Sequence, residues 1–313
     1  IITDQHKADH LGCYGNSVVQ TPNIDAISEG GMTFDRFYTA SPICMPNRAT
    51  LMTSRMPSCH GLRINGLPLS KDNVTFVDLL RHAGYRTGVI GKCHLQPMMN
   101  LPMGEVEYWP ESATGVAPSD DLMFSRRSRM NGPEYDQERA GVWAEDPNLE
   151  VETPYYGFDH MRFANFHGDM VHGHYSRWLQ ERHEDASSLR GKENALTDNT
   201  YNVKKGWRTR MPEELYPTTY IAEETIKYLD EHDKAETHAP FFLQCSFPDP
   251  HAPLTPPGKY WSMYDPSDVE LPVSFGHIDP NEPRFVQETR ARSDQPKKVP
   301  ALSLPDEKEA REN

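Results

Sequence analysis

Short apolar runs follow amphipathic stretches along this chain, which is the pattern of an α/β protein. Residues 75–84 begin at Thr75, carry an acid at Asp78 and end at Gly84, as expected for a helix with a capping box and a glycine stop. The apolar run 85–90 follows directly. Because it is short and bounded by glycine, it predicts a buried strand.

A second unit of the same kind lies further along the chain. Residues 220–232 place Ile221, Tyr228 and Leu229 at helical spacing. The apolar run 241–247 then predicts another strand. The first residues of the chain also have the character of a strand that ends just before an acid.

Polar side chains suited to binding ions follow each predicted strand. They are Asp4, Lys92, His94 and His251. Since open α/β sheets build their sites beyond the carboxyl ends of the strands, we expect these residues to converge. Taken singly, each has a plainer interpretation: a lysine in a loop is usually solvated, a loop histidine is usually structural, and Asp4 could cap a helix.

Residues 44–55 combine a cysteine, a proline and arginines before a helical stretch. Pro46 suits the first turn of a helix, which places Cys44 at its amino end. Backbone amides, the helix dipole and the charges of Arg48 and Arg55 would stabilise an anion there. The alternative is a buried cysteine whose neighbouring arginines pair with surface acids.

The Cys-x-Pro-x-Arg arrangement, with Thr53 and Arg55 downstream, resembles the signature of the sulfatase family. Residues 84–94 are similar to that family's second motif, whose lysine and histidine contact sulfate. Residues 248–253 look like its Pro-His-x-Pro segment, whose histidine binds sulfate or protonates the leaving oxygen. The resemblance implies an alkaline-phosphatase-like α/β sandwich, with a largely parallel sheet between helices.

The resemblance also implies a covalent mechanism. A formylglycine-generating enzyme would convert Cys44 to formylglycine, whose hydrated aldehyde attacks sulfur through one hydroxyl and expels sulfate through the other. Arg48 would stabilise the modified residue. The catalytic residues it implies are Cys44, Arg48, Lys92, His94 and His251.

A divalent cation belongs to the same resemblance. It implies Ca²⁺, with Mn²⁺ or Mg²⁺ as alternatives, bound by Asp4, Gln5 and Cys44. Gln5 offers only an amide oxygen where many relatives have a second aspartate. The family's later Ser-Asp-His-Gly-like stretch, which supplies two more ligands, finds no match after His251, so we expect either a fragment that lacks a C-terminal portion or a truncated relative.

The expected reaction is hydrolysis of a sulfate monoester. A phosphonate monoester or phosphodiester hydrolase is the alternative, and Lys92 favours sulfate because it can neutralise a terminal oxygen that a diester carries as an ester. A non-catalytic anion-binding relative is the third possibility. The net charge of −14 argues against nucleic-acid partners, and no apolar run reaches the roughly 20 residues of a membrane helix.

Residues 104–217 form the expected variable region that selects the substrate. Within it, residues 166–174 contain three histidines and one aspartate. His172 or His174 would contact the substrate, while a transition-metal site and plain loop residues remain alternatives. The basic run 126–129 is either a solvated surface or an anion contact.

We expect residues 1–264 to form the main part of the domain and residues 265–313 to be an extended, proline-rich and charged segment. The five cysteines contain no Cys-x-x-Cys pair and are odd in number, so their spacing indicates neither a zinc site nor a disulfide framework. That favours a reducing, cytoplasmic location, with a periplasmic or secreted one left open. The natural alcohol and the oligomeric state stay open as well.

Overall fold

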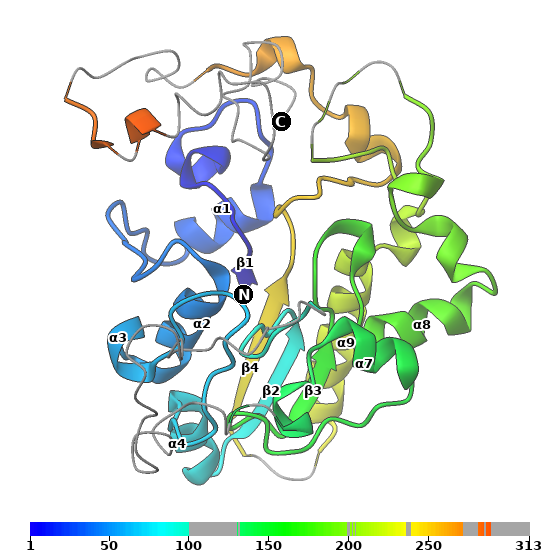
Figure 1. The fold of residues 1–313 in the computed structure, drawn as a ribbon. Coiled ribbons are helices and arrows are strands. Elements are labelled where there is room, and N and C mark those ends of the chain that lie inside the picture. The colour runs from blue at the N-terminus through cyan, green and yellow to red at the C-terminus, as the bar shows by residue number, and fades with distance from the viewer. Residues whose placement is uncertain are drawn as a thin grey trace, which may run out of the picture.

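A four-stranded parallel sheet organises the protein (Figure 1). The computed structural model describes residues 1–99, 130, 132–198, 201, 203, 205–235, 239–271, 281–284 and 286–288. The strands are β1 (Ile2–Thr3), β2 (Arg86–Gly91), β3 (His160–Phe163) and β4 (Phe241–Phe247), in the order β1-β4-β2-β3. Every neighbouring pair is parallel, so all four carboxyl ends lie at one edge.

Helices surround this sheet and connect its strands. Within the described part of the chain the α-helices are α1 (Pro22–Glu29), α2 (Cys44–Thr53), α3 (Pro57–His60), α4 (Phe76–His82), α7 (Ala140–Glu145), α8 (His174–Arg182) and α9 (Pro217–Asp233). Short 3-10 helices span Ala8–His10, Gly12–Tyr14, Pro133–Tyr135, Gly168–Met170, Ala186–Leu189, Lys192–Asn194, Glu213–Leu215, Gly258–Ser262 and Pro266–Asp268.

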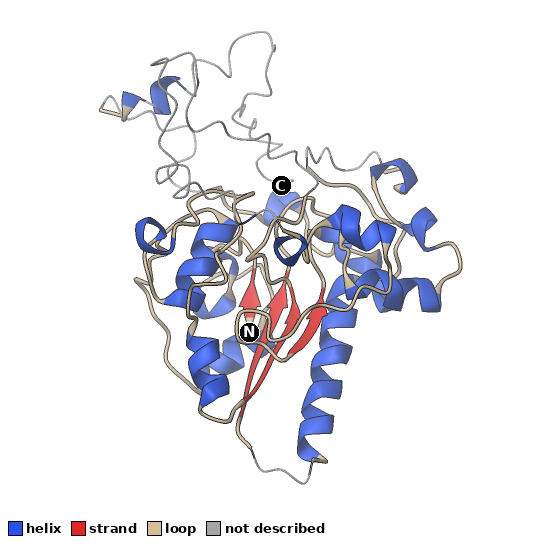
Figure 2. Ribbon diagram, turned by 60° about the horizontal axis from the view of Figure 1, so that its bottom comes forward, coloured by secondary structure: helices blue, strands red, loops and turns tan. Residues whose placement is uncertain are grey.

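The sheet lies between two helical layers, each with its own apolar core (Figure 2). Successive side chains of a strand point to opposite faces, and β2 shows this directly. Val89 packs in the core that contains residues of α2 and α4, whereas Ile90 packs in the core that contains residues of α8 and α9. The sandwich implied by the sequence is confirmed.

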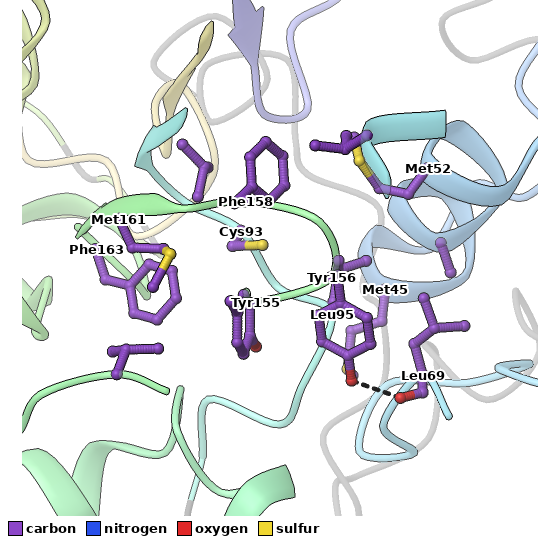
Figure 3. Packing of buried hydrophobic residues seen from close by; sticks show 14 of the residues in the cluster. Met45, Met52, Leu69, Cys93, Leu95, Tyr155, Tyr156, Phe158, Met161 and Phe163 are labelled. Carbon is purple, nitrogen blue, oxygen red and sulfur yellow. Dashed lines mark hydrogen bonds between the residues drawn. The ribbon is translucent and has the colours of Figure 1, made fainter. Parts of the chain in front are cut away.

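The first core is rich in sulfur and aromatic rings (Figure 3). Met45 and Met52 of α2 contribute to it, together with Tyr155, Phe158 and other residues around β3. The hydroxyl of Tyr156 in the same cluster donates a hydrogen bond to the backbone carbonyl of Leu69. These contacts fix α2, and with it Cys44, against the edge of the sheet.

The elements predicted from the pattern agree closely with the structure. Helix α4 begins after Thr75, whose hydroxyl accepts from the amide of Asp78 while the Asp78 carboxylate accepts from Thr75, so the capping box is present. Strand β4 covers the predicted residues and β2 is displaced by one. Helix α9 begins earlier than predicted because Pro217 occupies its first turn.

Two further sequence features can be compared with the structure. All five cysteines are free thiols. Among the residues described, no helix combines the length and the apolar character that crossing a membrane requires. The basic run 126–129 and the segment 289–313 lie outside the described residues.

Candidate active site

Loops from different strands meet where the strands end. Asp4 follows β1, and its amide donates to the carbonyl of Asp249 in the loop after β4, at 3.2 Å. Lys92 follows β2, and its amide donates to the carbonyl of Ser246 at 2.9 Å. The ladder of strand hydrogen bonds thus continues into the loops and fixes the backbones that carry these side chains.

Cys44 lies at the amino end of α2, directly above this edge. It is the first residue of the helix, and its Sγ donates to Oδ1 of Asp4 at 3.8 Å. Burial raises the pKa of the Cys44 thiol above its ordinary value, although the nearby charge of Lys92 opposes that shift. The thiol is therefore protonated at neutral pH and is a weak nucleophile as it stands.

Two buried cations flank the thiol. The Arg48 guanidinium donates to the carbonyl of Lys92 at 2.7 Å and to Oγ of Ser246 at 3.1 Å, and its Nη2 is 3.9 Å from Oδ1 of Asp4. The ammonium of Lys92 is completely buried and contacts Oδ2 of Asp4. Such desolvated charges interact far more strongly than the same charges in water.

The carboxylate between these cations is held ionised. Burial raises the pKa of Asp4, but a hydrogen bond from His167 and the charges of Lys92 and Arg48 outweigh it, so the pKa lies well below its usual range. Burial and the charge of Arg48 lower the pKa of Lys92, while Asp4 opposes the shift. The three groups form one compact ionic cluster.

Two histidines also line the site, next to Lys92. The rings of His167 and His251 stack with their centroids 3.5 Å apart and their planes at 9°. Nε2 of His167 contacts the Lys92 ammonium and lies 3.5 Å from Oδ2 of Asp4. Burial lowers the pKa of His167 to about 4, and burial also lowers the pKa of His251, so both rings are predominantly neutral at neutral pH.

His94 follows Lys92 by two residues, and its backbone is held by a buried acid. Its backbone has a left-handed φ of 60°. The amides of His94, Leu95 and Gln96 all donate to the Glu138 carboxylate, at 2.6, 2.9 and 3.0 Å, which is the arrangement of a backbone nest around an anion. The Tyr155 hydroxyl donates to the same carboxylate at 2.7 Å.

The structure brings together most of the residues singled out from the sequence. Asp4, Cys44, Arg48, Lys92 and His251 converge, with His94 behind them. Gln5 has a φ of 59° and an exposed side chain.

His172 and His174 lie elsewhere, although they belong to the same histidine-rich run. Nδ1 of His174 accepts from the amide of Phe163 at 3.0 Å, and its ring is 4.8 Å from that of Trp143. The His172 ring stacks on Phe166. Burial lowers the pKa of each of these histidines to about 3. Their role in substrate binding remains a prediction, since both are packed among aromatic rings.

His167 and Glu138 are the residues that sequence reasoning missed. His167 lies four residues after the end of β3, so a strand predicted at 160–163 would have placed it near the same edge of the sheet. Glu138 follows no strand, and its role depends on contacts with residues about 40 positions earlier. No local sequence signal could have found it.

The site fits a divalent cation in part. Among the described histidine, cysteine, aspartate and glutamate side chains, one group of three offers donor atoms that all lie within 4.8 Å of one another: Asp4, Cys44 and His251. A calcium ion takes about six to eight oxygens. Asp4 and the neighbouring Gln5 could supply some of them, and the remainder would come from outside the described residues.

Comparison with known proteins adds a family and a set of similar folds. The family model described as Sulfatase matches residues 1–104. An arylsulfatase of Clostridium perfringens is 28% identical over 276 residues, which cover 87% of this chain and 47% of that protein. An N-acetylglucosamine-6-O-sulfatase of Bacteroides thetaiotaomicron is 38% identical over 109 residues, 35% of this chain and 19% of that protein. The chain thus spans less than half the length of these relatives.

Among solved structures, the phosphonate monoester hydrolase of Agrobacterium radiobacter superposes with a TM-score of 0.58 at 23% identity, covering 86% of this chain and 44% of that one. A protein solved with its substrate D-glucosamine-2-N,6-O-disulfate superposes with a TM-score of 0.51 at 20% identity, covering 92% and 41%. At such identities the likeness establishes the fold.

Proposed function

Because this chain belongs to the sulfatase family, we propose that the complete protein hydrolyses a sulfate monoester to an alcohol and inorganic sulfate. One observation carries the proposal: Cys44 lies at the amino end of α2 between the buried cations Arg48 and Lys92 on one side and the stacked pair His167 and His251 on the other. Two relatives of the chain are sulfatases by name.

Arg48 and Lys92 would bind the sulfate oxygens. Arg48 is already oriented by the Lys92 carbonyl and Ser246, so it loses little side-chain freedom when the ester arrives. Both cations are desolvated, and a preorganised positive charge stabilises the negative charge that develops on the oxygens in the transition state. His94, whose backbone amide donates to Glu138, would keep a neutral ring near Lys92, since burial and the charge of Lys92 lower its pKa.

His251 would handle the proton of the leaving oxygen. Its Nδ1 donates to the carbonyl of Ala252 at 2.6 Å, which leaves Nε2 as the ring atom able to exchange a proton. Stacking against His167 keeps the ring in one plane. Nε2 can act as a general acid only in the protonated, imidazolium form of His251, and in that form the fixed ring would protonate the departing alcohol without reorganising first.

The thiol itself is protonated and poorly suited to the attack, which favours conversion of Cys44 to formylglycine. Formylglycine would supply a hydroxyl nucleophile, and a bound divalent cation, Ca²⁺ first and Mn²⁺ or Mg²⁺ as alternatives, would lower its pKa and hold a sulfate oxygen. Asp4 and the converted Cys44, with Gln5 beside them, are the residues of this chain that would hold that cation.

A comparison of two substrates tests the proposal. The complete protein, matured by a formylglycine-generating enzyme, should hydrolyse an aryl sulfate faster than the matching aryl phosphonate monoester, because Lys92 can neutralise a terminal sulfate oxygen. Cys44→Ala should abolish turnover of the sulfate. Faster phosphonate hydrolysis would assign the protein to the alternative chemistry, and no turnover by the converted protein would overturn the proposal.

A further inference from the structure

The two oxygens of the Asp4 carboxylate face different partners. Oδ2 contacts the Lys92 ammonium and lies near His167. Oδ1 points to the other side, 3.8 Å from Sγ of Cys44. Oδ2 therefore carries the contacts to Lys92 and His167, while Oδ1 faces both the thiol and Nη2 of Arg48, which is 3.9 Å away.

His251 completes a group of three donors around that thiol. A ring nitrogen of His251, a carboxylate oxygen of Asp4 and Sγ of Cys44 all lie within 4.8 Å of one another. The hydrogen bond from Nδ1 of His251 to the Ala252 carbonyl fixes the tautomer in which Nε2 carries a lone pair. Metal-binding histidines commonly have their second nitrogen anchored to a carbonyl in this way.

The donor types and their spacing select the metal. A tetrahedral zinc ion with a bond of about 2.3 Å to sulfur and about 2.0 Å to oxygen places those two atoms about 3.5 Å apart. The observed separation of 3.8 Å is close to that value. Thiolate and imidazole ligands suit Zn²⁺, whereas Ca²⁺ requires a shell of oxygens.

The charges are offset in part. Arg48 and Lys92 would repel an added dication, and the single negative charge of Asp4 already interacts with both of them. Binding would break the S–H bond of Cys44 and form a bond from sulfur to the metal, and the proton would leave to solvent. The new thiolate offsets one charge of the ion, so the cluster becomes more positive by one charge.

We propose that the chain whose Cys44 remains a thiol binds one Zn²⁺ through Asp4, Cys44 and His251, with the fourth position open to water. The site is distinct from the oxygen-ligated cation expected in the mature enzyme, because conversion of Cys44 removes the sulfur ligand. Zinc and maturation therefore compete for the same side chain. The three ligands come from separate parts of the chain, so the spacing of the cysteines gave no indication of the site.

Cobalt provides a direct probe, since a Co²⁺–thiolate bond gives a near-ultraviolet charge-transfer band. The complete protein, expressed without a formylglycine-generating enzyme, should show this band with one equivalent of Co²⁺ and lose it when Zn²⁺ is added. Cys44→Ser should abolish the band and weaken Zn²⁺ binding at least about 100-fold, more than the loss of an outer-shell partner would. His251→Ala should weaken Zn²⁺ binding more than about tenfold.

Cys59→Ser is the matched control, because Cys59 is an exposed thiol and should leave both measurements unchanged. A band that survives Cys44→Ser, or the absence of any band in the wild-type thiol form, would overturn the proposal. Circular dichroism of Cys44→Ser identifies a folding defect.

Alkylation gives a second readout that needs no variant. Zn²⁺ should protect Cys44 from iodoacetamide while leaving Cys59 reactive, as measured on their peptides by mass spectrometry. Equal labelling of Cys44 with and without zinc would contradict the site. Neither experiment depends on sulfate ester turnover, so failure of the zinc site and failure of the proposed function are separate results.

Discussion

The two sides of the candidate site use buried side chains in opposite ways. On the charged side, Arg48 and Lys92 are cations paired around the ionised Asp4. On the imidazole side, His167 is buried and His251 is half-buried, and burial lowers the pKa values of both and leaves them predominantly neutral. The same desolvation thus yields a fixed anion-binding surface on one side and groups that can exchange a proton or bind a metal on the other.

This difference has a physical origin. A guanidinium keeps its proton under all ordinary conditions, and Lys92 gains a carboxylate partner that offsets part of its desolvation. An imidazole has an ordinary pKa near neutrality, so a modest burial penalty is enough to discharge it. Substitutions on the two sides should consequently affect different steps of the reaction.

The largest effect is expected on the charged side. Arg48→Ala should lower kcat/KM for an aryl sulfate by about 10³-fold, because it removes a preorganised charge and exposes the Lys92 carbonyl and Ser246 to an unfilled space. Arg48→Lys keeps the charge but cannot make both hydrogen bonds, so it should recover only part of the loss. Steady-state kinetics of both variants measure this, and full activity in Arg48→Ala would remove Arg48 from the anion site.

On the imidazole side, His251→Ala should show a dependence on the leaving group. An alkyl sulfate, which needs its departing oxygen protonated, should lose about 10²-fold in kcat, while an activated aryl sulfate should lose much less. A series of aryl sulfates whose leaving groups have graded pKa values gives the slope of log kcat against leaving-group pKa. Equal losses across the series would deny His251 the role of general acid.

A smaller effect is expected at His167, which touches both sides. His167→Phe keeps an aromatic ring against His251 but loses the contacts to Lys92 and Asp4, whereas His167→Ala loses the stacking as well. We expect roughly a tenfold loss of kcat for Phe, about one lost hydrogen bond to a charged group, and a further loss for Ala. Identical kinetics in the two variants would show that stacking does not orient His251.

The last prediction concerns stability rather than activity. His174 has a folded-state pKa of about 3, so the unfolded chain takes up its proton first as the pH falls below 6.5, and stability is lost toward acid. This residue alone should cost about 2 kcal/mol of unfolding free energy between pH 7 and pH 5.

His174→Asn retains an acceptor for the Phe163 amide but cannot be protonated. Urea unfolding at the two pH values should give a smaller difference for the variant than for the wild type. An unchanged difference would show that His174 does not titrate as its burial implies.

Much of the charged side was predictable from sequence because its residues sit in local patterns. Lys92 follows a short apolar run bounded by glycine, Asp4 follows another, and Cys44 precedes a proline suited to a first helical turn. Sheet geometry then brings them to one edge without further information.

The imidazole side was less predictable because its residues lie in irregular segments. The run 166–174 follows β3 with a left-handed φ of 84° at Phe166, and this backbone, which no periodic pattern encodes, decides that His167 enters the site while His174 enters the core. Glu138 depends on three amides from a distant turn. Such contacts are tertiary, and composition or spacing cannot specify them.

The central claim is that Cys44 is the precursor of a formylglycine nucleophile. Peptide mass spectrometry of the complete protein, co-expressed with a formylglycine-generating enzyme, tests it most directly. The account predicts that the peptide containing Cys44 loses about 18 Da, the change from cysteine to the aldehyde. A peptide that keeps the mass of cysteine despite competent maturation would contradict the hydrolase account.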